Sequence, residues 1–387
     1  MNESPPDIAI SLIRGGALYW IQEKAGLIRP RTWDLHRRLL FVIAIAWLPL
    51  LILAAVHGGW ADVRAVLADY RVWARVFIAV PLLLVGQIVM DIRFHDMALH
   101  FADANLVGRD TLDRFVAIMR RARRLRDATL PELIIAIAVY AEAGYLSVSK
   151  TWVLTSWSID AGRGALTPAG SYSLLVTQPL FLILLAVTAW KWAIWARVLA
   201  QISRLPLHLD ATNGDCTGGL GFLADVPVAL VPAIAASSAV IGANWRTQVL
   251  VARTALDAFT WPAIAFAVIN VAVGALPLVV FVPQLIRERR YGMRVYGSLQ
   301  HLHSLQFREK WTTDPAAHAG DLLGTPDVSS LADISSGFKN VDGMVVYPCR
   351  RQTLVVLLLA AALPLLPALT TTIPLAEIVK TLFAAMH

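Results

Sequence analysis

The sequence predicts an all-α, polytopic membrane protein with about seven transmembrane helices and helical cytoplasmic extensions. Of its 387 residues, 57% are hydrophobic and only 16% are charged, against roughly 45–50% and about 25% in an average soluble domain. The mean hydropathy is +0.60, so the chain lacks the polar residues that would cover a soluble fold. The apolar residues form continuous runs, which favours helices over the alternating strands of a membrane barrel.

Seven apolar runs are each close to the roughly 20 residues that a helix needs to cross the hydrocarbon core. Only two formal charges lie within them, Arg75 near one end of the second run and Glu142 in the third. We expect Arg75 to reach the lipid headgroups, as long basic side chains do near the ends of spans. The predicted spans are Leu39–Val56, Val72–Met90, Leu133–Val148, Ser171–Trp190, Val226–Trp245, Ala258–Ile286 and Thr353–Leu375.

The distribution of Lys and Arg predicts the orientation of these spans. With a cytoplasmic N-terminus, the connecting segments on the cytoplasmic side hold 26 basic residues and those on the other side hold 7. Cytoplasmic loops carry the excess of basic residues, so we expect the N-terminus inside and the C-terminus outside. The predicted parts are a cytoplasmic N-terminal segment 1–38, a six-helix membrane domain 39–286 with cytoplasmic loops 91–132 and 191–225, a cytoplasmic helical segment 287–352, and a last span with an outer interfacial tail, 353–387.

The formal net charge of +7 fits basic loops that face the anionic lipids of the inner leaflet. We expect no nucleic-acid partner, because the basic residues are spread over separate loops without interleaved aromatic residues. The densest basic run, Arg120–Arg126, falls in a predicted amphipathic helix that we expect to lie on the inner leaflet. Asp110 and Asp113, in capping-box spacing, are expected to open it. Its apolar stripe consists of Leu112, Phe115, Val116 and Met119.

Three spans are predicted to continue into the cytoplasm as helices. The second is expected to run to about Ala104, the fourth to Arg204 and the sixth to about Trp311, and a further helix is expected to begin at Pro326, because proline favours the first helical position. Exposed leucines on such extensions need partners, so we expect a homo-oligomer. Both cysteines, Cys216 and Cys349, fall in predicted cytoplasmic loops and are expected to be free thiols.

The most distinctive loop spans residues 205–223 and ends in Asn213-Gly-Asp-Cys-Thr-Gly-Gly-Leu-Gly-Phe-Leu223. This end resembles a segment of an uncharacterised family of bacterial multi-spanning inner-membrane proteins, which reads His-Pro-Asp followed by Gly-Gly-Leu-Gly-Phe-Leu; here Asn213 and Gly214 stand in place of His-Pro. Residues 323–333 are also similar to that family. The resemblance implies a bacterial inner-membrane location and no particular activity. Backbone N–H groups in the glycine-rich part could hold an anion; the alternative is a tight turn between two spans.

A group of acidic and imidazole side chains is predicted near the cytoplasmic surface. Asp96, His100 and Asp103 share one face of the extension of the second span. Together with residues of the 205–223 loop they could form a carboxylate–imidazole metal site, or they could be a polar stripe outside the bilayer. The full set of candidates is Asp96, His100, Asp103, His208, Asp210 and Asp215.

Polar residues within the spans are the candidates for a permeation path. An ionisable group in hydrocarbon is costly and therefore indicates function by default, and Glu142 is the one carboxylate well inside a span. It could attract cations, carry a proton or pair with Lys191 or an arginine. The last span contains three prolines around a threonine run, and such a broken helix could line a pore. The candidate set is Glu142, Gln178, Asn270, Thr370, Thr371 and Thr372.

These observations favour a channel or passive transport protein for ions or small solutes. The alternatives are a membrane-anchored sensor or scaffold with a basic cytoplasmic face and, third, a metal-dependent membrane enzyme. We expect no enzymatic activity and no cofactor, because the sequence contains no catalytic triad, nucleotide-binding loop, thiol pair or haem motif.

Overall fold

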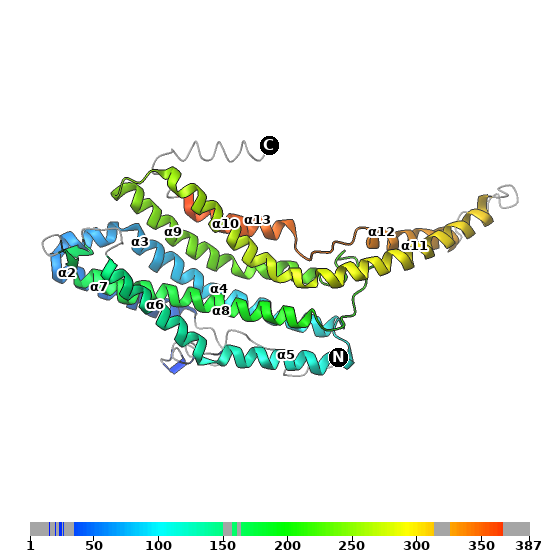
Figure 1. The fold of residues 1–387 in the computed structure, drawn as a ribbon, viewed down its shortest axis with the longest axis horizontal. Helices are drawn as coiled ribbons and strands as arrows, with labels where there is room; N and C mark the ends of the chain where they lie inside the picture. Colours follow the sequence, from blue (N-terminus) through cyan, green and yellow to red (C-terminus); the bar gives the residue numbers. More distant parts are fainter. Residues whose placement is uncertain are drawn as a thin grey trace.

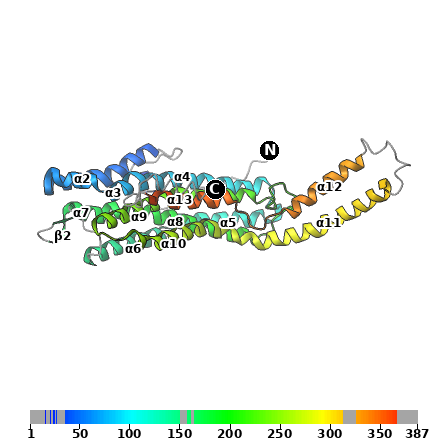
Figure 2. The same cartoon turned by 90° about the horizontal axis from the view of Figure 1, so that it is seen from above.

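The structure, a computed structural model, describes residues 35–149, 157–160, 164–312 and 326–366, with a few isolated positions before residue 27. These residues form an elongated bundle of helices, and a helical hairpin projects from one end of it (Figures 1 and 2). The only strands among them are β1 (Ile159–Asp160) and β2 (Ala165–Leu166), a short antiparallel pair at the opposite end. The fold is therefore all-α and polytopic, as the composition predicts.

The described helices follow the apolar runs closely. In chain order, the α-helices are α2 (Leu35–Ala68), α3 (Tyr70–Trp73), α4 (Val80–Asp103), α5 (Arg109–Asp127), α6 (Thr129–Ser149), α7 (Pro168–Tyr172), α8 (Gln178–Ile202), α9 (Val231–Val251), α10 (Thr260–Ala275), α11 (Val282–Thr312), α12 (Pro326–Asp342) and α13 (Arg351–Ala362). The tighter and wider turns that link them are η1 (Ala74–Ala79), η2 (Ser173–Thr177), η3 (Gly221–Leu230), η4 (Leu256–Phe259), η5 (Leu276–Phe281) and η6 (Leu363–Leu365).

Six helical rods are long and apolar enough to cross a membrane, although the first is kinked at Gly58 and Gly59 and the third is interrupted at Ala128. Each rod contains one of the first six predicted spans. The rods are Leu35–Ala68, Tyr70–Asp103, Arg109–Ser147, Pro168–Ile202, Gly221–Val251 and Leu256–Thr312. The seventh predicted span begins as α13 and η6, but the described helix ends near residue 366, short of the length that a span requires. The rest of that span and the tail to residue 387 lie outside the described residues, so the prediction of seven stays a prediction.

The expected helical extensions are present. The rod containing α4 runs to Asp103, α8 runs to Ile202 and α11 runs to Thr312. The last of these forms the hairpin that projects from the bundle, with α12 packed back along it (Figure 1). Near the tip, Asp327 joins the two helices by accepting bonds from Lys310 Nζ at 2.6 Å and Trp311 Nε1 at 3.0 Å. We call the end of the bundle with this projection the hairpin end.

The amphipathic helix α5 corrects two expectations. It begins at Arg109 with Gly108 as its N-cap and no capping side chain, so Asp110 and Asp113 lie inside the helix and form no capping box. Its apolar stripe is buried at Phe115 and Met119, yet it packs against α8 rather than facing lipid. Both environments are apolar, so an amphipathic pattern alone does not distinguish them.

Two of the membrane rods each contain one π-helical turn. These turns, η1 in the second rod and η2 in the fourth, lie within the first ten residues of each rod. A π-helical turn inserts extra backbone into an α-helix, is rare, and occurs mainly where a helix is shaped around a functional site. Both turns lie at the end of the bundle opposite the hairpin, which we call the Asp69 end.

Candidate functional site

The glycine-rich loop at the hairpin end is satisfied by its own side chain. Asp215 accepts the backbone N–H groups of Thr217, Gly219 and Gly221 at 2.8–3.1 Å, and the Thr217 hydroxyl at 2.8 Å. Gly218 and Gly219 have φ of +65° and +93°, the region that glycine tolerates best, and this lets the loop wrap around the carboxylate. The N–H groups expected to hold an external anion are therefore occupied.

This arrangement stabilises the ionised form of Asp215. Although partial burial opposes ionisation, the three N–H donors hold the pKa of Asp215 below its ordinary value because they favour the charged form. The loop is also fixed from outside: Val345 N–H donates to the Cys216 carbonyl at 2.7 Å, and Asn340 Nδ2 donates to the Thr212 carbonyl at 3.1 Å. The alternative prediction of a tight structural turn accounts for the loop. Both Cys216 and Cys349 are free thiols.

The other candidates for the predicted metal site do not assemble into one. His100 lies against the ring of Phe222, with centroids 4.1 Å apart, and Asp210 accepts the backbone N–H and hydroxyl of Thr212. His208 packs over Gly108, while Asp96 and Asp103 are exposed. Within the described ranges, no group of three or more His, Cys, Asp or Glu side chains is placed to hold a metal ion. The structure thus gives no support to a metal-dependent enzyme at these residues.

A polar pocket lies at the Asp69 end, among four of the six membrane rods. Its volume is about 440 Å³, within the range typical of small-molecule sites. We call it the Arg75 pocket. Its polar lining residues are Arg71, Arg75, Glu142, Gln178, Ser237, Asn244 and Gln248, and its apolar ones are Leu146, Phe181, Leu182, Leu185, Val240 and Ile241. A smaller cavity of about 80 Å³ adjoins it and shares Arg71, Arg75, Leu146 and Gln178.

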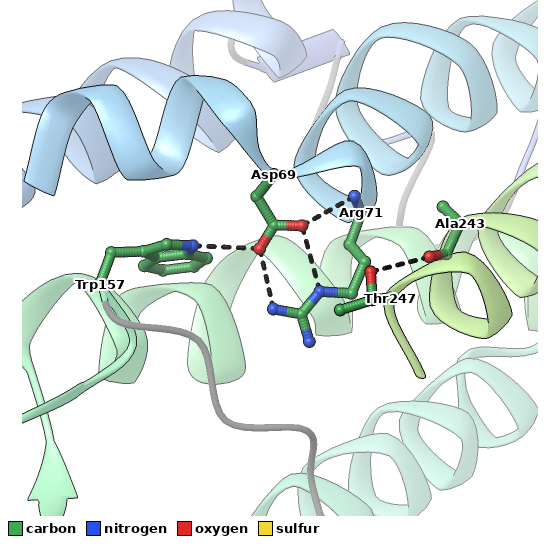
Figure 3. Close-up of polar contacts among 5 residues, drawn as sticks. All are labelled: Asp69, Arg71, Trp157, Ala243 and Thr247. Carbon is green, nitrogen blue, oxygen red and sulfur yellow. Dashed lines mark hydrogen bonds and ion pairs between the residues drawn. The ribbon is translucent and has the colours of Figure 1, made fainter. Parts of the chain in front are cut away.

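Asp69 holds Arg71, one of the residues that line this pocket, in position (Figure 3). Its carboxylate accepts the backbone N–H of Arg71 at 2.9 Å and begins α3 as the N-cap, and it also binds the Arg71 guanidinium through Nε at 3.1 Å and Nη2 at 2.8 Å. Trp157 Nε1 donates to the same carboxylate at 3.0 Å. Burial opposes ionisation of Asp69, but Arg71 and Trp157 outweigh it and lower the pKa of Asp69 below its ordinary value. Arg71 is thereby held in place by a paired charge.

Arg75 differs from Arg71 in having no such partner. It lies in η1, is 9% exposed, and its Nε is buried without a hydrogen bond. We expected this side chain to reach the headgroups; instead it is enclosed by neighbouring helices. A position near the end of a span does not determine whether a side chain faces lipid or protein, and here Arg75 lies in η1, which packs against α9.

The structure brings some of the permeation candidates together and separates others. Glu142 and Gln178, from the third and fourth rods, line the same pocket. Asn270 does not line it: its side-chain Nδ2 donates to the Phe266 carbonyl one turn earlier in α10. Thr370, Thr371 and Thr372 lie outside the described residues. Asn244, a polar residue within the fifth predicted span, lines the same pocket, whereas Arg71, Ser237 and Gln248 are polar lining residues that the sequence did not single out.

A second cluster of buried polar side chains lies inside the bundle, nearer the hairpin end. Arg38 is 3% exposed and donates from Nη2 to Gln87 Oε1 at 3.0 Å, while Asp91 and Lys191 are 7% and 5% exposed. Lys191 interacts electrostatically with Glu132 and Asp91, and with the cations of Arg38 and Arg126. The suggested pairing of Glu142 with Lys191 is therefore not formed; instead, the buried lysine is balanced by carboxylates nearer its own end.

Comparison with known proteins adds no relative: no family model, no curated protein and no solved structure matches this chain.

Proposed function

We propose that this membrane protein moves a small polar solute or ion passively across the bilayer, and that the Arg75 pocket is one opening of its path. The observation that carries the proposal is the convergence of polar side chains from four membrane rods on a single pocket. Polar and ionisable groups within spans are costly, and in membrane proteins they mark substrate and ion pathways.

The second rod links this pocket to the buried polar group farther along the bundle. It carries Arg75 in its first turns and then Gln87 and Asp91, both buried, in α4. One helix therefore presents polar side chains both at the Asp69 end and toward the hairpin end.

The test is solute flux through liposomes that contain the purified chain. Wild type is compared with Glu142→Gln and Gln178→Leu, which change the pocket lining, and with Asn270→Leu, a matched control in a polar residue of another rod. The proposal expects flux in wild type, at least a fivefold loss or an altered selectivity in the two pocket variants, and little change in the control. Absence of flux of cations, anions and small neutral solutes from folded protein would overturn it.

A membrane-anchored sensor or scaffold is the second candidate, and one observation favours it. The projecting hairpin exposes apolar side chains, including Leu299 at 46% and Leu302 at 58%, which a soluble partner or second copy could cover. The double variant Leu299→Gln/Leu302→Gln separates the two candidates. Under the transport proposal its flux equals that of wild type, whereas under the scaffold alternative the chain shows no flux and the variant loses its partner.

A further inference from the structure

The Arg75 pocket holds two opposite charges that do not pair with each other. Arg75 and Glu142 both line it, yet within the described part of the chain neither side chain forms an ion pair or a hydrogen bond. Arg71, the other cation of the lining, is already joined to Asp69. The pocket therefore offers one buried, unpaired guanidinium and one exposed, unpaired carboxylate to whatever occupies it.

Burying Arg75 without a hydrogen-bonding partner costs free energy unless a ligand supplies that partner. A guanidinium that is nine-tenths buried with its Nε unbonded lacks the hydrogen bonds that compensate the loss of water. A cation in the pocket would satisfy Glu142 but be repelled by Arg75, and an anion would satisfy Arg75 but be repelled by Glu142. Only a ligand that carries both charges satisfies both residues at once.

We infer that the Arg75 pocket binds a small zwitterion, with its anionic oxygens on Arg75 and its ammonium group on Glu142. This inference rests on the proposed function for what the pocket does. It adds the chemical class of the solute. The amide side chains of Gln178, Asn244 and Gln248 in the same lining supply both donors and acceptors to the remaining polar atoms. The apolar wall, which includes Phe181 and Val240, fits the carbon atoms between the two charges.

Two sources provide this chemistry. One is a free amino acid or related solute, in which a carboxylate and an ammonium group are separated by one to three carbon atoms. The other is the phosphoethanolamine headgroup of a lipid, in which a phosphate replaces the carboxylate and the charges are similarly spaced. Both present an anionic oxygen group to Arg75, which guanidinium binds through paired hydrogen bonds.

The experiment measures binding by calorimetry to the full chain in an uncharged maltoside detergent. The probes are glycine, 3-aminopropanoate and 4-aminobutanoate, which increase the separation of the charges stepwise, and free phosphoethanolamine. Acetate and methylammonium are the matched single-charge probes. We expect one zwitterion to bind at least tenfold more tightly than either single-charge probe. Best binding by an amino acid identifies a free solute, and binding by phosphoethanolamine alone identifies a headgroup.

Variants connect this binding to the two residues. Glu142→Gln, at an exposed position, and Arg75→Gln are each expected to weaken zwitterion binding at least tenfold and to leave little preference over the single-charge probes. Arg75→Lys keeps the cation and retains part of the affinity. Arg246→Gln removes a nearby arginine that does not line the pocket and keeps wild-type binding. Equal affinity for zwitterions and single charges in wild type, or no binding of any probe, overturns the inference.

The result is separable from that of the flux assay. Flux of other solutes without zwitterion binding would leave the transport proposal standing and remove this inference. Zwitterion binding without flux of any solute would leave the binding site standing and remove the transport proposal.

Discussion

The two ends of this molecule treat their polar groups in opposite ways. At the hairpin end, Asp215 is surrounded by donors from its own loop, so this charge has its partners within a few residues. At the Asp69 end, Arg75 and Glu142 line a pocket and have no partners in the described part of the chain. The comparison teaches that an unusual sequence motif can be wholly structural, while two ordinary charges on different helices can mark the site.

The comparison extends to the stability that each group contributes. A buried charge whose partner is in place adds little net stability, but removing the partner is strongly destabilising because the remaining charge stays buried and unpaired. A charge that waits for a ligand contributes little and can even destabilise the empty protein. Substitutions at the two ends should therefore rank in an order that burial alone would not give.

The largest effect is expected at Asp69, which pairs with Arg71 and Trp157 beside the pocket. Asp69→Ala should lower the free energy of unfolding by about 3 kcal/mol, because it leaves a largely buried guanidinium without its carboxylate. Thermal unfolding of the detergent-solubilised chain measures the change. Asp62→Ala, which removes the more exposed hydrogen-bonded contact with His57 Nδ1 at the same end, is the control and should cost less than about 1 kcal/mol. Equal losses in the two variants would contradict the assigned role of Asp69.

A smaller loss is expected at Asp215. Asp215→Ala removes the acceptor of three backbone N–H groups, and we expect a cost of about 1–2 kcal/mol because water reaches part of the loop and replaces some of these bonds. The matched control is Asp210→Ala in the same loop, where the carboxylate accepts only from Thr212. Hydrogen exchange of the Gly219 and Gly221 amides should accelerate in the first variant only. Unchanged exchange there would mean that the loop does not depend on its carboxylate.

Acid should weaken both ends through the same chemistry. The pKa values of Asp69 and Asp215 are lowered below the ordinary value of 3.8 in the folded chain. A lowered folded-state pKa gives stability that is present above the unfolded-state value and lost as the pH falls through the folded-state value. The unfolding temperature should therefore fall between pH 5 and pH 3, and the fall should be shallower in Asp69→Asn. Parallel pH profiles for variant and wild type would refute the contribution of Asp69.

The smallest effects are expected at the pocket charges themselves. Arg75→Gln and Glu142→Gln should each change the free energy of unfolding by less than about 1 kcal/mol, with Arg75→Gln on the stabilising side because it removes an unpaired buried charge. Thermal unfolding without added solute is the measurement. A loss as large as that of Asp69→Ala at either position would show that the residue has a structural partner. The contrast between the two ends of the molecule would then be wrong.

Hydropathy was sufficient to predict much of the fold. The six long rods contain the first six predicted spans, and a helix covers Pro326–Asp342, where a further helix was predicted. Periodicity also identified the buried stripe of α5, but could not state its partner, because lipid and the surface of α8 are equally apolar. The pattern of residues along one helix shows which face is apolar, but not whether lipid or another helix covers that face.

The candidate site was predicted only in part, for a related reason. Glu142 and Gln178 were recognisable as polar residues within apolar runs, and the structure places both in one pocket. Arg75 was misplaced because its position near the end of a span suggested contact with the headgroups, and the sequence does not show that Ala74–Ala79 packs against α9. Asp215 was assigned to a possible metal site because nothing in its neighbours indicates that they fold back onto it.

The hairpin is a long helical projection whose base is joined to the sixth membrane rod. The sixth rod is one continuous run of helix from Leu256 to Thr312, and α11 alone spans 31 residues, a length of about 46 Å at 1.5 Å per residue. If α11 moves as a stiff body with α10, a tilt of about 10° at its base sweeps the tip through about 8 Å. Small rearrangements among the membrane helices would thus be amplified into displacements large enough for a label at the tip to report in real time.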